Sequence, residues 1–554
     1  MDAGLSERDL NKVQRVLGPG ALQQIKENPY VLARLLPLNV VDGVAKKLRV
    51  PLFGNPQRGV ALAEYLLDKA LLDGHCYVHV HTLLQEARYG CKLTDKTFTE
   101  KHLGSRLIVE DRYAMLPDIH AAETFVARRV TELLARRDVR NISVAAGAQT
   151  SNEGMLVRDV DQDQAIRQLR FEPISVVTGA PGTGKTTCTT VALDYFDANQ
   201  ISYALCAPTG KAARRLSEVT GRRASTIHRL LEWRPSGFVH NQHAPVQVDV
   251  VIVDEASMLD IRLAADLLAA IDPTRTRIAF IGDVNQLPPV GPGAFFSDLI
   301  DSGLVPIVRL TTLHRAAANS WICRNAPKIL AGKGVELDAD VPDYDWYEMK
   351  TKDAANIKNV AADVIRKLQA EGLSWDDFQL LTPMKIKTGG AFELNTALRE
   401  ALISPQGLTT TIGAYETEAT VTRGDRVIQM RNDYELNIFN GETGQIALVD
   451  GPDSVKVRFD EEYRVVKGAR LKNMALAYAL TTHKFQGSQC GTVIVICHSV
   501  HGRMLNRRLF YTAVTRARKK VILIGDADGV KQAIANTQDQ KRRTRLIDRI
   551  SGKL

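Results

Sequence analysis

The chain of 554 residues lacks long hydrophobic runs and any clustered cysteines. No apolar stretch reaches the roughly 20 residues that a membrane-spanning helix needs, and Met1-Asp2-Ala3 does not open a secretory signal peptide. The seven cysteines are scattered without metal-ligand spacing, and we expect Cys188 and Cys206 to be small core residues. These absences argue against helical membrane spans and cysteine-based metal sites, and predict a reduced, cytoplasmic protein.

The balance of charge is mildly basic. Lys and Arg number 72 against 63 Asp and Glu, a net charge of +9, which favours a polyanionic partner. With 45% hydrophobic residues over this length, the chain can bury several cores. We therefore expect three or four domains.

A phosphate-binding loop follows the apolar stretch 174–178. The loop reads Gly179-Ala180-Pro181-Gly182-Thr183-Gly184-Lys185-Thr186 and matches G-x-x-x-x-G-K-[ST]. Its glycines let successive backbone N–H groups face the phosphates, while the lysine reaches the β/γ oxygens and the threonine hydroxyl can bind Mg²⁺. Because 187–195 reads as a helix, the pattern predicts a nucleoside triphosphate site.

A second apolar stretch, 250–253, ends in the adjacent carboxylates Asp254 and Glu255. Neighbouring side chains at a strand end point in different directions, so the two acids can have different roles. Behind a phosphate loop, we assign Asp254 to the Mg²⁺ shell and Glu255 to orienting or deprotonating the attacking water. This pair predicts hydrolysis of the nucleotide.

The next apolar stretch, 277–281, leads into Gly282-Asp283-Val284-Asn285-Gln286-Leu287-Pro288-Pro289-Val290, which resembles motif III of superfamily 1 helicases. The segment 253–258 resembles motif II as the RecD family writes it. Further resemblances follow in the family's order: 207–213 (Ia), 225–231 (Ib), 313–315 (IV), 478–488 (V) and 511–517 (VI). Over about residues 1–530 the chain resembles RecD-like helicases, and most closely the stand-alone 5′→3′ enzymes.

A few positions depart from that family. Ala316 follows the motif IV arginine where glutamine is usual, and Gln489 stands where motif V often ends in an acid. For the nucleotide base, the family's Gln-x-x-Ala spacing favours Gln162 over Gln164. Each departure concerns one secondary contact and leaves the expected chemistry intact.

The resemblance implies an α/β fold with two RecA-like P-loop motor domains, each with a parallel sheet, a small SH3-like β-barrel insert and a mainly helical N-terminal domain. The expected boundaries are 1–150 for the N-terminal region, helix-hairpin-helix-like and then winged-helix-like; 151–335 for the first motor domain, with a β-hairpin pin at 231–247; 336–404 and 471–554 for the second motor domain and a basic tail; and 405–470 for the insert. We expect the family's longer N-terminal extension to be missing, and the tail 541–545 to be a solvated helix face.

The same resemblance implies roles for individual residues. Lys185, Glu255, Gln286, Arg315 and Arg516 are the expected catalytic residues, the two arginines acting as cis arginine fingers. The expected cofactors are ATP and Mg²⁺. ATP would contact Gln162, Gly179, Ala180, Pro181, Gly182, Thr183, Gly184, Lys185, Thr186, Thr187, Arg315 and Arg516, and Mg²⁺ would contact Thr186 and Asp254.

Single-stranded DNA and a fork between single and double strands are the expected partners. The strand would contact Pro208, Thr209, Thr226, His228, Pro289, Thr382, Pro383, Thr482, His483 and Lys484, with Phe238 and His240 on the strand-separating pin. We expect a monomer without membrane contact, which meets single-strand-binding or other repair and replication proteins. The implied function is ATP-dependent 5′→3′ unwinding in DNA repair, recombination or replication.

Three alternatives stay open at the level of sequence. A ring-forming or signalling P-loop ATPase would share the first two sites, although it would not need motifs III and VI in helicase order. An RNA-directed superfamily 1 helicase would keep every motif. The first 120 residues are also compatible with a protein-binding module, the motor then serving a larger helicase-nuclease complex.

Overall fold

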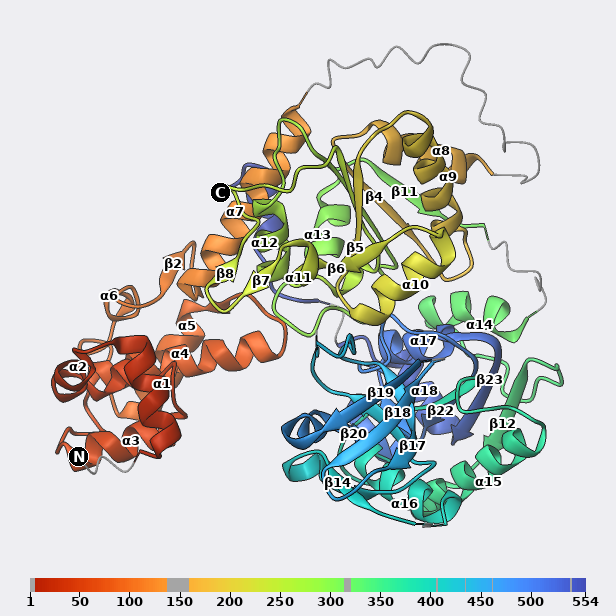
Figure 1. The fold of residues 1–554 in the computed structure, drawn as a ribbon. Helices are drawn as coiled ribbons and strands as arrows, with labels where there is room; N and C mark the ends of the chain where they lie inside the picture. The colour runs from red at the N-terminus through yellow and green to blue at the C-terminus, as the bar shows by residue number, and fades with distance from the viewer. Residues whose placement is uncertain are drawn as a thin grey trace.

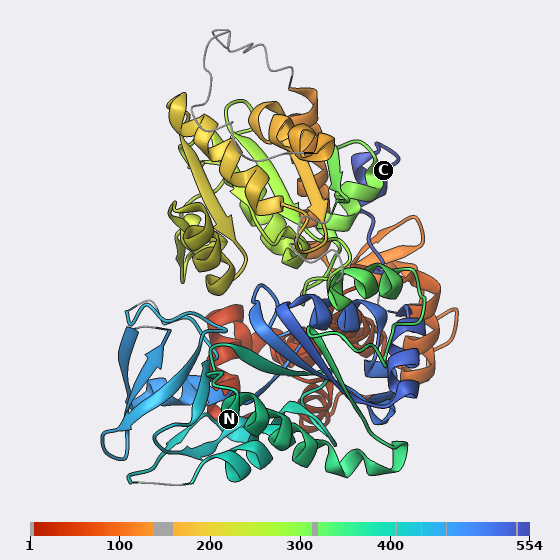
Figure 2. The ribbon, with the colours of Figure 1, turned by 90° about the vertical axis from the view of Figure 1, so that its right-hand side faces the viewer.

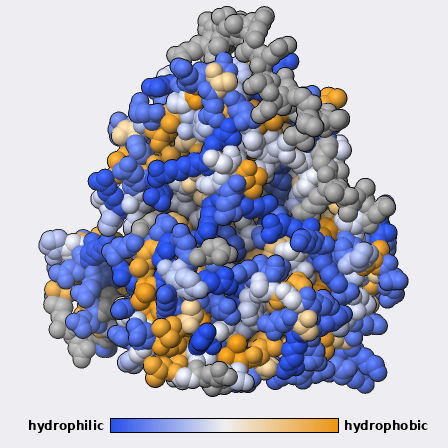
Figure 3. Space-filling view, turned by 45° about the vertical axis from the view of Figure 1, so that its right-hand side comes forward, coloured by the Kyte–Doolittle hydropathy of each residue, from blue (hydrophilic) through white to orange (hydrophobic). Residues whose placement is uncertain are grey.

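The computed structural model describes residues 5–136, 159–312, 320–404, 407–433, 435–460, 462–538 and 541–554. Two α/β domains lie one above the other, with an N-terminal helical region to one side of them (Figures 1 and 2). The face drawn in Figure 3 is mostly hydrophilic, with hydrophobic residues in small separate patches. None of the described helices is both long and apolar enough to cross a bilayer.

The N-terminal region begins with short helices and continues into a small sheet. Its elements are α1 (Glu7–Leu17), α2 (Ala21–Glu27), α3 (Leu38–Lys47), α4 (Pro56–Leu72), β1 (Val78–His79), α5 (Val80–Cys91), α6 (Glu100–Leu103), β2 (Ile108–Glu110), β3 (Tyr113–Met115) and α7 (Pro117–Ala135). Local chemistry starts these helices: Ser6 and Asp9 form a capping box on α1, and the Asn55 side chain accepts a hydrogen bond from the Gln57 N–H at the start of α4. The strands pair in the order β1-β3-β2.

The first α/β domain contains a six-stranded sheet in the order β11-β4-β10-β9-β5-β6, in which every pair is parallel. Its elements are α8 (Val160–Phe171), β4 (Ile174–Gly179), α9 (Lys185–Ala198), β5 (Tyr203–Ala207), α10 (Gly210–Thr220), β6 (Ala224–Thr226), α11 (Ile227–Leu230), β7 (Trp233–Arg234), β8 (Gly237–Phe238), β9 (Val250–Val253), α12 (Ile261–Ala269), β10 (Arg277–Gly282), α13 (Phe295–Ser302) and β11 (Ile307–Leu310).

Both faces of this sheet are covered, which explains why its central strands are mostly apolar. Every residue of β9 and β10 is buried. Val251 and Val253 point to the face covered by α7, α12 and α13, while Val250 and Ile252 point to the face covered by α8 and α9. The N-terminal helix α7 is therefore part of the core of the first α/β domain.

The second α/β domain contains a five-stranded sheet in the order β12-β23-β22-β13-β21, again with parallel pairs. Its elements are α14 (Trp321–Leu330), β12 (Tyr344–Glu348), α15 (Ile357–Ala370), β13 (Phe378–Thr382), α16 (Ala391–Leu402), β21 (Ala479–Thr481), β22 (Cys490–Cys497), α17 (Arg507–Thr515), β23 (Ala517–Gly525) and α18 (Ala527–Ala535). The expected boundary at residue 335 is wrong, because α14 packs here: Trp321 stacks on Tyr344 with ring centroids 4.2 Å apart.

An antiparallel unit interrupts the second α/β domain between β13 and β21. Its strands are β14 (Thr410–Ile412), β15 (Ala419–Val421), β16 (Arg426–Gln429), β17 (Thr443–Val449), β18 (Ser454–Phe459), β19 (Glu462–Lys467) and β20 (Met474–Leu476). The strands β19-β18-β17-β16-β20 form one sheet, and β14 pairs with β15. Because β20 completes this sheet, the unit extends beyond the expected end at residue 470.

The chain end leaves the second α/β domain and returns to the first. Its helix α19 (Leu546–Ile550) packs on α7 and α13, and Leu546 and Ile550 are buried in the core that α7 and the first sheet share (Figure 1). The prediction that 541–545 is a solvated helix face is therefore wrong: Arg545 is only 6% exposed. Partners in the N-terminal region neutralise its charge.

Candidate functional site

Three neighbouring strands of the first sheet end at the same edge and carry the predicted motifs. The strand β10 lies between β4 and β9, and all three run parallel. The phosphate loop follows β4, Asp283 follows β10 and Asp254 follows β9. Ligands of parallel α/β sheets bind at the carboxyl ends of the strands, so the topology brings the predicted residues of this domain to one site.

The phosphate loop has the backbone that its glycines permit. Gly182 and Gly184 adopt φ of 91° and 90°, values that side chains disfavour. Lys185 opens α9, and its Nζ donates to the carbonyls of Gly179 at 2.5 Å and Ala180 at 3.1 Å. Burial lowers the pKa of Lys185, while the nearby Asp283 carboxylate acts in the opposite direction. A cation and a helix N-terminus therefore face one space, as a phosphate group requires.

Gln162 contacts this loop from α8. It is buried within a capping box with Asp159, and its Nε2 donates to the carbonyl of Thr183 at 3.4 Å. A cavity of about 280 Å³ lies between the loop, Leu310, α14 and α17. Both α/β domains therefore line a space beside the phosphate loop.

The adjacent carboxylates lie beneath the loop. Burial, followed by the Glu255 carboxylate, raises the pKa of Asp254 to about 6. Glu255 adopts φ of 52°, a left-handed conformation that is uncommon outside glycine and that accumulates at functional sites. Arg215 on α10 interacts electrostatically with both acids, and burial lowers its pKa. The site thus contains opposite charges held in a partly desolvated space.

The oxygen donors at this edge fit a Mg²⁺ ion. Mg²⁺ prefers hard oxygen ligands and keeps several of its waters, so one hydroxyl and one carboxylate suffice. Thr186 lies in the first turn of α9, and Asp254 directly follows β9. A divalent cation would also offset the repulsion between Asp254 and Glu255. These two residues, Thr186 and Asp254, would hold the ion.

A buried network joins this site to the second α/β domain. Asp283 is buried, and its Oδ2 accepts hydrogen bonds from Tyr511 Oη at 2.9 Å and from Gln286 Nε2 at 3.3 Å. The N–H of Leu287 donates to Thr512 Oγ1 at 2.9 Å, and Gln486 Nε2 donates to the carbonyl of Leu287 at 3.1 Å. Residues 283–287 therefore link Asp283, the acid near Lys185, to the second domain.

Arg516 approaches the same site from the second domain. It is fully buried; its Nε donates to the carbonyl of Thr512 and its Nη1 to that of Ser488, each at 3.3 Å. Within the described part of the chain, Nη2 has no hydrogen-bond partner. A buried guanidinium nitrogen without a partner is costly and favours an anion beside it. Arg315 and Ala316, the other predicted motif IV positions, lie outside the described residues.

The residues predicted to contact single-stranded DNA do not follow β4, the strand that precedes the phosphate loop. Those of the first domain end β6, follow β5 or lie on α11, except Pro289, and those of the second end or follow β13 or follow β21. The structure leaves Pro208, Thr209, His228, His483 and Lys484 at least partly exposed and buries Thr226, Pro289, Thr382, Pro383 and Thr482. The Thr382 hydroxyl, for example, donates to the carbonyl of Gly389 at 2.6 Å.

These two sets of loops meet across the domains. A Cβ on Gly487 would lie 3.0 Å from Thr209 Oγ1, and Lys211 Nζ lies 5.0 Å from the centre of the Phe485 ring. The antiparallel unit lies beside these loops, since its Phe439 packs on Gly210 and its Asn440 Oδ1 accepts from Lys484 Nζ. A cavity of about 450 Å³ follows between α10 and the insert.

The segment 231–247 contains the predicted β-hairpin, formed by β7 and β8 around Pro235 and Ser236. Phe238, expected on the pin, lies in β8 and packs on His228 with ring centroids 5.6 Å apart. His240, also expected on the pin, follows β8, and its Nδ1 lies 3.1 Å from the carbonyl of Ala244. The exposed part of the hairpin is Trp233 to Gly237. Of the two aromatic residues on the hairpin strands, Phe238 packs on the domain and Trp233 is exposed.

The sequence motifs did not single out several residues of the site. Tyr511 and Thr512 lie inside the predicted motif VI, yet their contacts with residues 283–287 depend on how the two domains pack. The sequence gives only a weak indication that Arg215 belongs to the site: it follows Lys211 by one helical turn and so lies on the same face of α10. Asp283 was part of motif III without an assigned role, and its burial between Tyr511 and Gln286 supplies one.

Three family models match separate segments of the chain. The family model described as "ATP-dependent RecD2 DNA helicase HHH domain" matches residues 1–77, "AAA domain" matches 162–292 and "UvrD-like helicase C-terminal domain" matches 476–524. A solved structure of Pif1 helicase from Bacteroides, in complex with ADP-AlF3 and ssDNA, is 18% identical, covers 68% of this chain and 94% of that one, and has a TM-score of 0.46.

Two curated relatives are more similar in sequence. The ATP-dependent RecD2 DNA helicase of Deinococcus radiodurans is 38% identical over 78% of this chain, which spans 58% of that protein's length. The RecBCD enzyme subunit RecD of Mycolicibacterium smegmatis is 33% identical over 68% of this chain and 72% of its own length. The resemblance stated from the motifs is thereby confirmed: the chain belongs to the RecD family of helicases.

Proposed function

We propose that this protein is an ATP-dependent DNA helicase that moves 5′→3′ on single-stranded DNA and unwinds duplexes. The observation that carries the proposal is the continuous segment 283–289. At one end Asp283 and Gln286 lie beside the phosphate loop, in the middle Leu287 bonds to the second domain, and at the other end is Pro289, a predicted strand contact. Nucleotide-dependent closure of the domains would therefore change the strand-binding side.

The hydrolytic step requires charge stabilisation around the transferring phosphoryl group. Lys185 would bind the β/γ oxygens from the loop, and Arg516 would bring its unpartnered Nη2 to the γ-phosphate from the other domain. Mg²⁺, held by Thr186 and Asp254, would neutralise phosphate charge when bound. Because one chain contains both halves of this site, a monomer suffices for turnover.

Glu255 would orient and deprotonate the attacking water. Glu255→Gln keeps the shape of the side chain and removes the base, so we expect ATP binding to persist and turnover to fall by about 10²-fold or more. Equilibrium binding of a fluorescent ATP analogue and single-turnover hydrolysis measure the two effects separately. Normal turnover in this variant would remove Glu255 from the catalytic role.

The N-terminal match favours a stand-alone enzyme over a subunit of a nuclease complex. The RecD2 HHH-domain model covers residues 1–77, and these residues build the helices that lead into α4. We propose DNA rather than RNA because one curated relative is named a DNA helicase and the other a RecBCD enzyme subunit. Comparing the stimulation of ATP turnover by single-stranded DNA and by RNA of the same length tests this choice.

The hairpin β7–β8 would act as the wedge that separates strands. Deleting residues 236–242 should abolish strand displacement while DNA-stimulated ATP turnover survives, because translocation uses the cleft between the domains and separation uses the wedge. The assay compares duplexes with 5′ tails and with 3′ tails, and we expect unwinding only from 5′ tails.

Two outcomes would contradict this account. Unwinding that begins only from 3′ tails would reverse the polarity. Unwinding by the deletion variant at the normal rate would leave the hairpin a connecting loop. Because the deletion also removes Phe238 from its contact with His228, thermal unfolding of the variant must match the wild-type protein before either result is read.

A further inference from the structure

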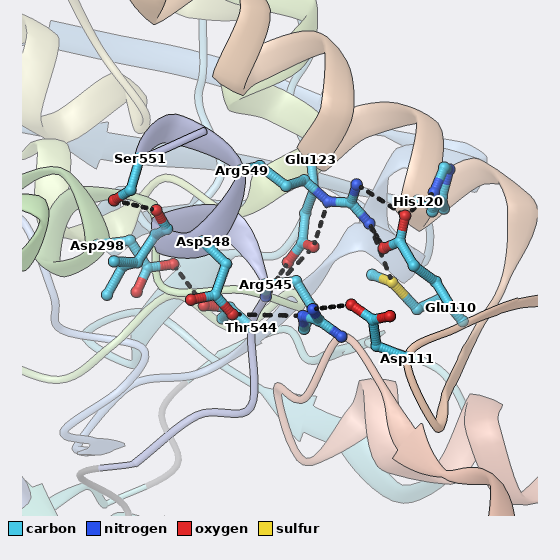
Figure 4. Close-up of polar contacts among 12 residues, drawn as sticks. Glu110, Asp111, His120, Glu123, Asp298, Thr544, Arg545, Asp548, Arg549 and Ser551 are labelled. Carbon is cyan, nitrogen blue, oxygen red and sulfur yellow. Dashed lines mark hydrogen bonds and ion pairs between the residues drawn. The ribbon is translucent and has the colours of Figure 1, made fainter. Parts of the chain in front are cut away.

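The chain end forms a strap over the first α/β domain. We define the C-terminal strap as residues 541–554, which follow the second α/β domain and lie against α7 and α13 (Figure 4). The Arg545 guanidinium pairs with Asp111 at 3.1 Å, and the Arg549 guanidinium pairs with Glu110. The Thr544 hydroxyl donates to Asp298 Oδ2 at 2.8 Å. The strap therefore has a defined position on the N-terminal region and the first domain.

Arg542 of the strap contacts the end of motif III and the glycines that follow it. Its Nη1 donates to the carbonyls of Gly291 and Gly293, and its Nη2 donates to the carbonyl of Pro289. Gly74 of the N-terminal region lies against the guanidinium so closely that a Cβ there would lie 2.3 Å from Arg542 Cζ. The N–H of Gly293 in turn donates to the carbonyl of Gly74 at 2.9 Å. Three distant parts of the sequence thus meet at one side chain.

The same loop is held at its other end by the second α/β domain. Leu287 both donates to Thr512 and accepts from Gln486, while Arg542 holds the backbone from Pro289 onward. Between these two attachments the chain has only Pro288. Arg542 holds Pro289 in place, so a movement of the second domain at Leu287 is transmitted to Pro289. Without this contact, the flexible glycines that follow would take up the movement.

We propose that Arg542 is a positioning residue that fixes the loop 289–293 and so couples ATP turnover to the DNA strand. The inference rests on the proposed function, because it concerns the coupling between ATP turnover and DNA. It assigns that coupling to a residue outside every helicase motif. The planar guanidinium suits this task, since its donors point in fixed directions and can bind three carbonyls at once. Lysine carries the same charge without that geometry.

The structural half of the proposal is tested without nucleotide or DNA. In Arg542→Ala, hydrogen–deuterium exchange of the segment 284–296 should become faster than in the wild-type protein. Arg543→Ala is the matched control: it removes a neighbouring arginine whose backbone hydrogen bonds to His75 and Cys76 stay in place. Unchanged exchange in Arg542→Ala would overturn the claim that this residue fixes the loop.

The functional half is tested by ATP turnover with and without an oligothymidylate. Arg542→Ala should keep the basal rate and lose at least about fivefold of the DNA stimulation, a typical coupling effect. Arg542→Lys should restore only part of it, and Arg543→Ala should behave as wild type. Full stimulation in Arg542→Ala, or equal losses in both alanine variants, would refute the coupling role. A wild-type protein that DNA does not stimulate would refute the proposed function and the coupling, while the exchange result would still report on the loop.

Discussion

Replacing Lys185 with alanine should reduce ATP turnover by about 10³-fold or more, since it removes the one cation that the phosphate loop itself supplies. The Nζ of Lys185 lies within 3.1 Å of two loop carbonyls and faces the acids of the neighbouring strands. Binding of single-stranded DNA should persist, because the predicted strand contacts follow β5, β6, β13 and β21 and not β4. Steady-state hydrolysis and fluorescence anisotropy of a labelled oligonucleotide measure the two properties.

Loss of DNA binding as large as the loss of hydrolysis would contradict this separation of sites. A fold defect would produce the same pattern, so the thermal unfolding midpoint of Lys185→Ala has to be compared with that of the wild-type protein. We expect a small change, because the Lys185 side chain donates to loop carbonyls and a buried ammonium is itself unfavourable.

Arg516→Ala should lower kcat by about 10³-fold, as removal of an arginine finger does. The affinity for nucleotide should change less, because the guanidinium approaches from the second domain and acts when the cleft closes. Lysine should rescue poorly, since a point charge cannot keep the bonds to Thr512 and Ser488 while it contacts a phosphate oxygen. Quenched-flow hydrolysis with saturating ATP measures kcat directly.

The chain offers a matched control two residues away. Arg518 lies at the start of β23, directly after Arg516 and Ala517, and is exposed, so Arg518→Ala removes an equal charge from the surface. We expect this variant to turn over ATP at the wild-type rate. An Arg516→Ala enzyme as active as Arg518→Ala would show that the motif VI arginine is not a finger in this protein.

The sequence predicted which strand ends of the first domain carry the phosphate loop and the acids, because these features are local. Gly179 to Thr186 is one continuous loop, and Asp254 and Asp283 each follow an apolar strand, so parallel topology alone brings them together. The order of the motifs also predicted two α/β domains. Such features depend on strand ends and loop glycines, which a sequence displays directly.

Features that depend on contacts between distant segments were not predicted. The position of α14 depends on the stacking of Trp321 on Tyr344, and that of the strap depends on acids more than 400 residues earlier, such as Glu110 and Asp111. A basic stretch reads as a solvated face when its partners are unknown. The packing of the Phe238 ring on His228 is another contact of this kind, and the motifs did not indicate it.

The strap also limits how the two halves of the molecule separate. The second α/β domain is connected to the first by two chain crossings, one after β11 and one between α18 and Arg542. The second crossing runs from Asn536, whose side chain bonds to the carbonyl of Leu505, to Arg542 on the motif III loop. A tether of this length reaches at most roughly 20 Å when fully extended. In the proposed ATP cycle, these two crossings would restrict how far the second domain can move from the first.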